Sequence, residues 1–313
     1  MSHTLAVGSV ALDTVETPFG RAEGVVGGSA VYFSAAASLF GPVSVVGVVG
    51  SDYPREELGF LERRGVDLSG LRQADGSSFR WGGRYDYDLN ARETLFTDLG
   101  VFAGFEARVP ERLRGADWVF LGNIDPGLQH DVLDQVSGPR LVACDTMNYW
   151  IERRRESLLA LLGRIDMLVV NDAEARELAD DHNLARAADW ILERGPTWAL
   201  IKKGEHGAIL FGEEDCFFSP GYPLEEVFDP TGAGDAFAGG VLGHLARTGQ
   251  LGGEELRRAV VFGCATGSFA CEAFGPDRFR ELAAGEVSRR VHSFREMTQF
   301  EHEHEHGASD GGG

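Results

Sequence analysis

The sequence predicts an α/β protein, a three-layer α/β/α sandwich in which a mainly parallel sheet carries helices on both faces. Two observations lead to this prediction. Short apolar runs of strand length alternate along the chain with longer amphipathic stretches of helical spacing, which is the order expected of βαβ units. In addition, several of the apolar runs end in Asn or Asp, as strands do where they lead into a ligand site.

Taken in order, the segments with the composition of buried strands are 5–12, 43–50, 117–123, 140–145, 166–171 and 198–204. Amphipathic stretches at 155–164 and 184–195 have the spacing of helices. Asn123, Asp145 and Asn171 close three of the strands. Because ligands bind beyond the carboxyl ends of strands in open α/β sheets, these polar ends indicate the edge of the sheet where a site lies.

Two segments, 14–28 and 78–98, interrupt this alternation. They are rich in Thr, Val, Tyr, Phe and Gly, and they lack helical spacing. We expect them to form β-structure that stands off the main sheet as a small lid, since a closing lid excludes water from a site. The alternative is a pair of ordinary surface hairpins.

We expect one domain over residues 1–298 and a disordered tail over 299–313. The tail, QFEHEHEHGASDGGG, is polar and Gly-rich and has too little apolar surface to order itself. His302, His304 and His306 alternate with Glu and could hold a metal weakly if the tail were extended. A solvated tail is the simpler interpretation.

Composition and charge exclude several classes of protein. The formal net charge of -20 disfavours nucleic acid and anionic membrane as partners. No apolar run approaches the roughly 18 residues of a membrane span, and the first residues lack the pattern of a signal peptide. The four cysteines form no CxxC pair, so neither a zinc site nor a redox motif is indicated. We therefore expect a cytoplasmic protein.

In the segment DPTGAGDAFAGG (229–240), an acid, Asp235, directly follows three small residues and precedes an apolar run. Glycine lets the backbone turn tightly and approach a ligand closely. A helix that begins near Gly232 would present free N–H groups, which together with the helix dipole form an anion site. Asp235 in its first turn could accept the proton of a hydroxyl that attacks phosphorus. The alternative is an acid that only favours the helix dipole.

Further motifs add to this one. A glycine pair at 27–28 enters a small-residue helix, VGVVGSD (46–52) ends another strand, and VNDAE (170–174) follows a third. With DPTGAGDAF (229–237), these motifs resemble those of the PfkB, or ribokinase-like, family of carbohydrate kinases. The resemblance extends over about residues 4–290. A Rossmann dehydrogenase is poorly supported, because no GxGxxG follows the first strand.

The resemblance implies a ribokinase-like fold and an ATP- and Mg²⁺-dependent kinase. Such an enzyme would transfer the γ-phosphoryl group to a primary hydroxyl of a sugar or sugar-like acceptor. Asp235 would be the general base on that hydroxyl. Gly232, Ala233 and Gly234 would form the anion hole for the transferred group.

The resemblance also implies a nucleotide site. Asn171 and Glu174 would position the phosphates, with Glu174 acting on Mg²⁺ through water, and residues 262–275 would form one wall. Further nucleotide contacts are predicted at Lys203, Gly204, Gly207 and Thr231. Asp229 is a candidate contributor to a monovalent-cation site, with K⁺ as the ion. The alternative for Glu174 is a solvated residue on a helix face.

The residues predicted to bind the acceptor are Asp13, Gly27, Gly28, Tyr32, Arg84 and Asp145. Asp13, at the end of the first strand, would accept hydrogen bonds from substrate hydroxyls, or would only cap a turn. Ribose kinases usually carry Asn where this chain has Tyr32, which puts plain ribose in doubt. Tyr32 could stack on a sugar or base, or pack in the core. Arg84 in the lid could contact a phosphate already on the acceptor, or face solvent.

Alternatives to the sugar kinase remain open at this point. A nucleoside kinase of the same fold differs only in its acceptor pocket. A non-catalytic sugar sensor on the same scaffold would have no need of a base such as Asp235. A homodimer assembled through the lid is a further expectation.

Overall fold

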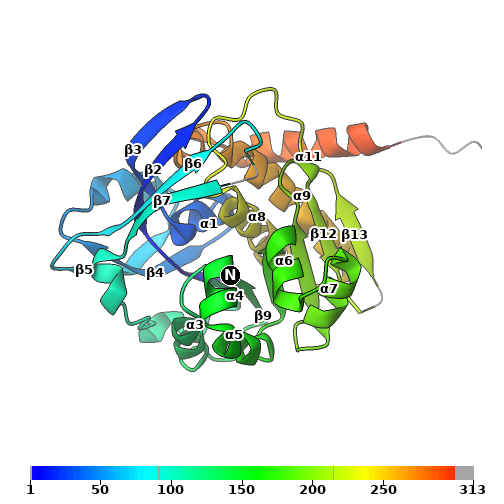
Figure 1. Cartoon of the computed structure of the whole chain (residues 1–313), viewed down its shortest axis with the longest axis horizontal. Helices are drawn as coiled ribbons and strands as arrows, with labels where there is room; N and C mark the ends of the chain where they lie inside the picture. Colours follow the sequence, from blue (N-terminus) through cyan, green and yellow to red (C-terminus); the bar gives the residue numbers. More distant parts are fainter. Residues whose placement is uncertain (1, 90–91, 214, 300–313) are drawn as a thin grey trace, which may run out of the picture.

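The computed structural model describes residues 2–89, 92–213 and 215–299. Residues 300–313, most of the predicted tail with its three histidines, lie outside the described residues. The chain forms a nine-stranded sheet of order β13-β12-β11-β10-β9-β8-β1-β4-β5 and a four-stranded sheet of order β3-β2-β6-β7 (Figure 1). Within the described residues, no helix combines the length and apolar character that crossing a bilayer requires.

The nine-stranded sheet consists of β1 (Thr4–Val7), β4 (Val43–Gly50), β5 (Asp67–Ala74), β8 (Trp118–Leu121), β9 (Leu141–Asp145), β10 (Met167–Asn171), β11 (Trp198–Lys202), β12 (Ala208–Phe211) and β13 (Cys216–Ser219). Its strands pair in parallel from β5 to β11, whereas β12 and β13 add an antiparallel edge. The four-stranded sheet consists of β2 (Ala11–Thr17), β3 (Gly20–Gly27), β6 (Phe79–Tyr85) and β7 (Arg92–Asp98).

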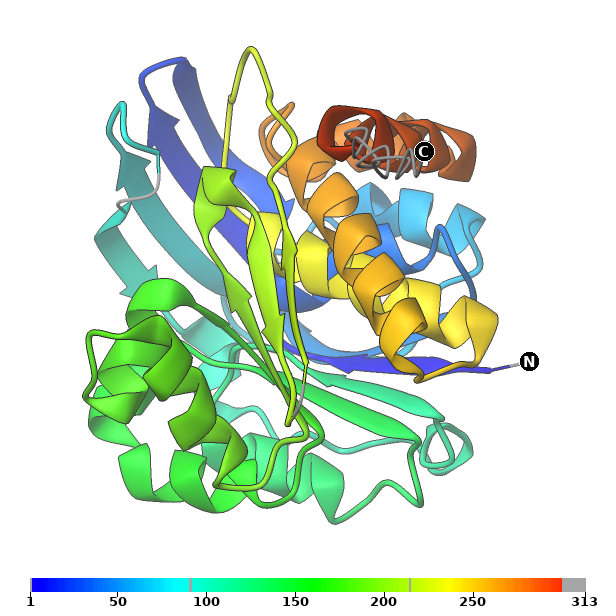
Figure 2. The ribbon, with the colours of Figure 1, turned by 90° about the vertical axis from the view of Figure 1, so that its right-hand side faces the viewer.

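Helices cover both faces of the large sheet, which confirms the predicted three layers. One face carries α1 (Ser29–Ala37), α2 (Gly59–Arg63), α8 (Ala233–Thr248), α9 (Gly253–Ala270), α10 (Asp277–Glu281) and α11 (Ala284–Thr298). The other carries α3 (Pro126–Leu133), α4 (Asn148–Arg153), α5 (Arg155–Leu162), α6 (Asp172–Ala179) and α7 (Leu184–Leu192). Figure 2 shows the two helical layers with the strands between them. Neighbouring strand residues alternate between the two buried cores, as the period of a strand requires.

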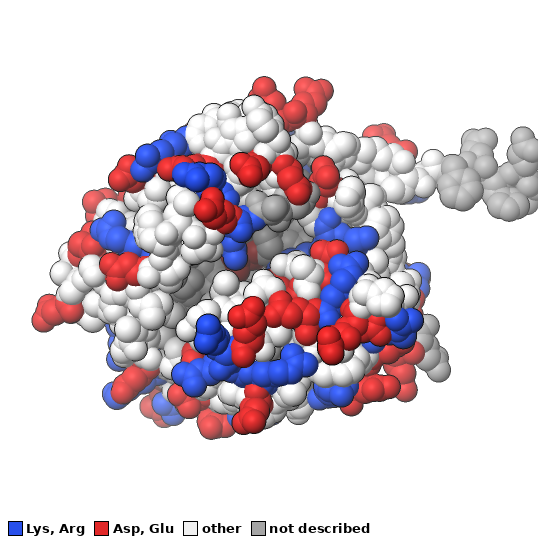
Figure 3. All heavy atoms as spheres, in the orientation of Figure 1, with Lys and Arg blue, Asp and Glu red and all other residues white. Residues whose placement is uncertain are grey.

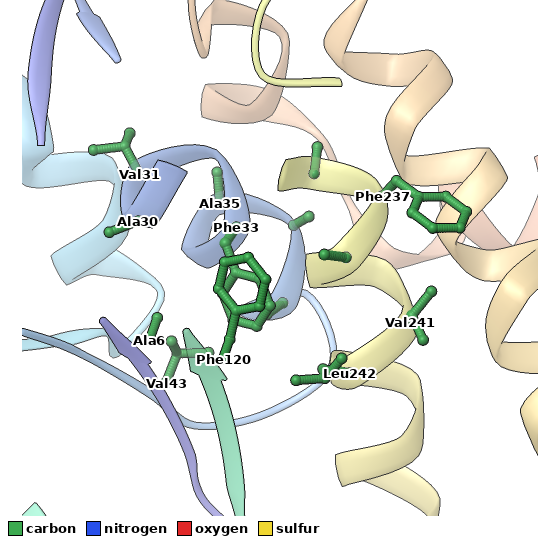
Figure 4. Close-up of a cluster of buried hydrophobic side chains, with 14 of the residues drawn as sticks. Ala6, Ala30, Val31, Phe33, Ala35, Val43, Phe120, Phe237, Val241 and Leu242 are labelled. Atoms are coloured by element: carbon green, nitrogen blue, oxygen red, sulfur yellow. The ribbon is translucent and has the colours of Figure 1, made fainter. Parts of the chain in front are cut away.

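Close packing of α1 against α8 fixes the position of the site. The Phe33 ring of α1 stacks on the Phe120 ring of β8, with centroids 4.1 Å apart (Figure 4). A Cβ atom at Gly239 would overlap the carbonyl oxygen of Phe33, and one at Gly240 would overlap the hydroxyl of Thr266. The run of small residues in α8 therefore lets α1 and α9 approach its backbone and holds its first turn at the edge of the sheet.

The first predicted strand, 5–12, is wrong as a single element. β1 ends at Val7, and the chain then leaves the large sheet before β2 begins at Ala11 in the small one. Residues 5–12 are all buried and mostly apolar, so the sequence shows no break between β1 and the start of β2. Asp13 consequently lies in the four-stranded sheet and not at the end of the first strand.

The segments 14–28 and 78–98 form β-structure outside the main sheet, as expected. They are more than two separate hairpins, because β2 and β6 pair in parallel and join the two ribbons into one sheet. We refer to β2, β3, β6 and β7 as the lid sheet. Its closure over a ligand, the assembly of two chains through it and a cytoplasmic location of the protein all stay predictions.

Candidate active site

Polar residues at the carboxyl ends of neighbouring strands converge on one edge of the large sheet. Asp145 is the last residue of β9, Asn171 that of β10 and Lys202 that of β11. Asn171 and Lys202 are register partners. Figure 3 shows this side of the molecule hollowed between the lid sheet and helix α6, with charges of both signs around the hollow. Asp145, Asn171 and Lys202 therefore lie at the edge of the sheet where ligands bind in open α/β folds.

The first turn of α8 offers unpaired N–H groups to this hollow. Gly232 precedes the helix with φ 76°, a conformation that favours glycine, and a Cβ there would overlap the ring of Tyr32. The N–H groups of Gly232, Gly234 and Asp235 donate to no described residue. That of Ala233 donates to the carbonyl of Pro230 at 3.2 Å, so the chain itself already uses one of the predicted anion-hole donors.

The carboxylate of Asp235 is free for a ligand. It lies in the first turn of α8 and accepts no hydrogen bond from any described residue. Burial, and then the negative charge of Asp145, raise the pKa of Asp235 to about 7. A carboxylate with a pKa near the working pH is suited to take a proton from a reacting hydroxyl.

Lys202 is a site residue that the sequence analysis missed in favour of its neighbour Lys203. Its Nζ lies 2.9 Å from Oδ2 of Asp145, and a Cβ at Gly234 would lie 3.0 Å from the same Nζ. The ammonium group thus lies beside the anion hole. Burial acts to lower the pKa of Lys202, but the carboxylates of Asp145 and Glu174 raise it overall, so the group stays charged. Its place at the end of a buried strand was the signal available.

Asn171 and Glu174 hold each other in a capping box at the start of α6. Oδ1 of Asn171 accepts the N–H of Glu174, and Oε2 of Glu174 accepts the N–H of Asn171, each at 2.8 Å. Glu174 is buried, so the alternative of a solvated residue on a helix face is wrong. Burial raises the pKa of Glu174 to about 7, against the opposing charge of Lys202.

A turn that contains three of the predicted nucleotide residues joins β11 to β12. The N–H of Lys203 donates to the carbonyl of Gly207 at 2.7 Å, and Gly204 and Gly207 have φ 57° and 93°. Only residues without a Cβ adopt both values readily. The segment 262–275 begins within α9, where a Cβ at Gly267 would lie 3.1 Å from the carbonyl oxygen of Ala233. The segment 262–275, expected as a nucleotide wall, therefore lies beside the start of α8.

Asp13 faces the same region from the lid sheet. It is buried and lies against Gly27, where a Cβ would overlap its carboxylate, and the backbone of Gly28 hydrogen-bonds to it. Burial and the neighbouring Asp229 carboxylate raise the pKa of Asp13 to about 8, with a smaller contribution from Asp235. The structure thus brings the predicted acceptor residue close to the predicted base, and the glycine pair makes room for it.

Two buried tyrosine hydroxyls also face this group. Those of Tyr32 and Tyr53 have no hydrogen-bond partner among the described residues. Burial raises the pKa of both tyrosines, and the charge of Asp13 adds to the effect. A buried polar atom without a partner carries a free-energy penalty that a ligand could relieve. Tyr53 was not predicted, although SDYP follows a strand that ends at the site.

Asp229 and Thr231 shape the loop before α8. The two carboxylate oxygens of Asp229 accept the N–H groups of Thr231 and Gly275, at 2.8 and 3.2 Å. The hydroxyl of Thr231 donates to that of Tyr85 on the lid sheet at 3.3 Å. Asp229 therefore ties the loop to the end of the nucleotide wall. Its contribution to a K⁺ site stays a prediction.

Arg84 is not brought to the other predicted residues. Its guanidinium forms ion pairs with Glu16 at 2.9 Å and Glu93 at 3.4 Å. Because successive strand residues face opposite sides, Arg84 faces away from the side on which Tyr85 contacts Thr231. We therefore leave Arg84 out of the candidate site.

A separate cavity of about 560 Å³ lies between β13, α9 and α11. It is lined largely by aromatic and aliphatic side chains, among them Phe217, Phe262 and Phe294. Of the predicted site segments, only the nucleotide wall 262–275 reaches it, through Phe262, and no predicted catalytic or acceptor residue lines it, so its size is no argument for catalysis there.

Known proteins share this architecture. Residues 113–281, more than half of the chain, match the family described as pfkB family carbohydrate kinase. The chain is 29% identical over 252 residues to the cytidine kinase of Thermococcus kodakarensis, an alignment that covers 79% of this chain and 90% of that protein. The solved nucleoside kinase of Burkholderia thailandensis, in complex with inosine, gives a TM-score of 0.76 at 23% identity and covers 93% of this chain and 97% of that chain. The aminoimidazole riboside kinase of Salmonella enterica, complexed with its riboside and an ATP analog, gives 0.75 at 20% identity and covers 93% and 100%.

The fold and these relatives define the protein as a phosphotransferase of ribokinase-like architecture. The chain belongs to the pfkB family of carbohydrate kinases.

Proposed function

We propose that the protein transfers the γ-phosphoryl group of ATP to a primary hydroxyl of an uncharged sugar or nucleoside. The observation that carries this proposal is the free carboxylate of Asp235, placed in the same helical turn as the unpaired N–H groups of Gly232 and Gly234. A proton acceptor beside an anion site is what phosphoryl transfer to a hydroxyl requires.

In the proposed reaction, the acceptor oxygen attacks the γ-phosphorus and its proton passes to the Asp235 carboxylate. The bond between the γ-phosphorus and the bridging oxygen breaks, and ADP leaves with that electron pair. The N–H groups at the start of α8 stabilise the charge on the transferred group, and Lys202 lies beside them. Asp13 and the hydroxyl of Tyr32 orient the acceptor. Most of the catalysis then comes from positioning and preorganised charge.

The residues present suit Mg²⁺ held mainly by the nucleotide. The described residues contain no group of three His, Cys, Asp or Glu that could cage an ion. Mg²⁺ usually keeps several waters and binds through one or two carboxylates together with substrate phosphates. Glu174 is the carboxylate that would reach it through water, and the ion would neutralise charge on the phosphates. K⁺ stays an expectation of the same kind.

An uncharged acceptor is favoured by the charges around its expected position. Asp13, Asp229 and Asp235 lie on that side of the site, and their charges act on one another. A phosphate already on the acceptor would be repelled by the ionised forms of these carboxyl groups. Arg84, the cation considered for such a phosphate, faces the other side of the lid sheet.

Nucleosides are the second candidate, and the likeness to a cytidine kinase over 90% of that protein favours testing them first. A panel of nucleosides and sugars with ATP and Mg²⁺, read as ADP release, tests both candidates. We expect turnover with one class of neutral acceptor and a product phosphorylated at the primary hydroxyl, as identified by ³¹P NMR. Acceptor binding without any ADP release would instead indicate the non-catalytic sensor.

A further inference from the structure

Arg92 of the lid sheet faces the reaction centre. It is the first residue of β7 and the register partner of Tyr85 on β6. Cross-strand partners share one face of a sheet, and the hydroxyl of Tyr85 contacts that of Thr231 just before α8. The face that carries Arg92 therefore lies over the anion hole. The next register pair, Arg84 and Glu93, has the opposite orientation.

The guanidinium of Arg92 lies over an aromatic ring and has no ion pair with any described residue. Its Cζ lies 5.2 Å from the centroid of the Trp81 ring, on the neighbouring strand. No described residue forms an ion pair or a side-chain hydrogen bond with it. An arginine carries five N–H donors, so this one keeps its donors available for a ligand. By contrast, the ammonium group of Lys202 is already paired with Asp145.

The electrostatic neighbours of Arg92 belong to both halves of the site. Burial is the largest influence on the pKa of several acidic groups here, and the positive charge of Arg92 opposes it in Asp13, Tyr85, Glu174 and Asp235. Asp13 and Tyr85 lie on the acceptor side, whereas Glu174 lies on the nucleotide side. Because the charge of Arg92 acts on groups of both sides, Arg92 lies near the boundary between them. The phosphoryl group would pass from the nucleotide to the acceptor at this boundary.

We propose that Arg92 is a catalytic residue that donates hydrogen bonds to the non-bridging oxygens of the γ-phosphoryl group during its transfer. The proposal rests on the proposed function. As the acceptor oxygen bonds to phosphorus and the bridging oxygen leaves with ADP, the charge on these oxygens is met by N–H groups from α8 below and by Arg92 from the lid sheet. Arginines that supply charge in this way can accelerate phosphoryl transfer by orders of magnitude.

The test compares Arg92→Ala with Arg84→Ala. Arg84 belongs to the adjacent register pair of the same ribbon and faces the other side, so its substitution removes two ion pairs from the lid sheet without touching the site-facing side. We expect Arg92→Ala to lower kcat by about 10²–10³, with the KM for acceptor and for ATP within about threefold. The kcat of Arg92→Lys should lie between those of wild type and Arg92→Ala, because lysine keeps the charge but lacks the planar guanidinium with its paired donors. Arg84→Ala should stay within about threefold of wild type.

Two further readouts separate chemistry from folding. Added guanidinium ion should restore part of the activity of Arg92→Ala and leave that of Arg84→Ala unchanged, which a structural role of Arg92 would not produce. The slow transfer of the phosphoryl group to water, measured as ATP hydrolysis without acceptor, should fall at least about tenfold in Arg92→Ala alone.

The outcomes also separate this proposal from the one it rests on. If wild type hydrolyses ATP but phosphorylates no sugar or nucleoside, the acceptor class is wrong, while the hydrolysis rates still test Arg92. If Arg92→Ala keeps kcat and hydrolysis but raises the acceptor KM, the arginine binds the acceptor and the proposal is overturned. No ATP turnover by wild type under any condition would overturn both.

Discussion

At the scale of single residues, Asp235 has a raised pKa, and its carboxylate accepts no hydrogen bond from any described residue. We expect Asp235→Asn to lower kcat by about 10²–10⁴ and to leave nucleotide affinity within a few fold, because the amide keeps the shape but cannot accept the proton. Asp189→Asn on α7, an exposed acid, is the matched control. Steady-state kinetics and calorimetric ATP binding check both. Activity of Asp235→Asn within a few fold of wild type would remove it from the mechanism.

The same residue gives a pH dependence with a definite sign. A general base acts only when it is unprotonated, and burial holds the pKa of Asp235 at about 7. Activity should therefore be present above this value and be lost as the pH falls through it. Protonation of Asp13, whose pKa is about 8, would lower activity in the same direction if its carboxylate accepts hydrogen bonds from the hydroxyls of the acceptor. A profile of kcat/KM from pH 5.5 to 9 checks this, and one that is flat between pH 6 and 8 would contradict it.

At the scale of elements, the position of α8 depends on close contact with α1. We expect Gly239→Ala to destabilise the fold by about 1–3 kcal/mol, because the new methyl group would overlap the carbonyl of Phe33 and neither helix backbone can yield. Gly285→Ala is the control, since this exposed helical glycine of α11 has only the end of Arg289 nearby and should gain up to about 1 kcal/mol from helix propensity. Denaturant unfolding of both variants gives the comparison, and equal stabilities would refute the packing argument.

Predictability also differs between elements. The parallel strands other than β5, and the start of α8, were predicted because apolar runs, glycines and polar strand ends are local signals. The split of the first strand was not predicted, since residues 5–12 form one mostly apolar run and only the pairing partners at 43–50 and 79–85 separate β1 from β2. Lys202 was missed for a related reason, because its role depends on Asp145 across two strands. Arg84 was predicted as a site residue and Arg92 was not, because the side that a strand residue faces depends on register, which the sequence left open.

At the scale of the whole molecule, the site is shared between the large sheet and the lid sheet. Asp13, Tyr85 and Arg92 come from the lid sheet, whereas Tyr32 and Asp235 come from helices packed on the large sheet. A ligand that contacts both parts restrains one against the other. The acceptor, expected between Asp13 and Asp235, is such a ligand, and most of the nucleotide contacts are expected on the large sheet alone.

This division predicts which ligand orders the lid sheet. We expect the acceptor, in the presence of ATP or a non-hydrolysable analogue, to slow amide hydrogen exchange in β2, β3, β6 and β7, because its contacts with both parts offset the entropy lost on ordering. The nucleotide alone should protect the turn at 204–207 and the start of α8 and leave the lid sheet nearly unchanged. Exchange followed by mass spectrometry in the free, binary and ternary states measures this. Helix α5, on the opposite side of the large sheet from α8, serves as the internal reference. Full protection of the lid sheet by nucleotide alone, with no further change on adding acceptor, would show that the acceptor does not close it.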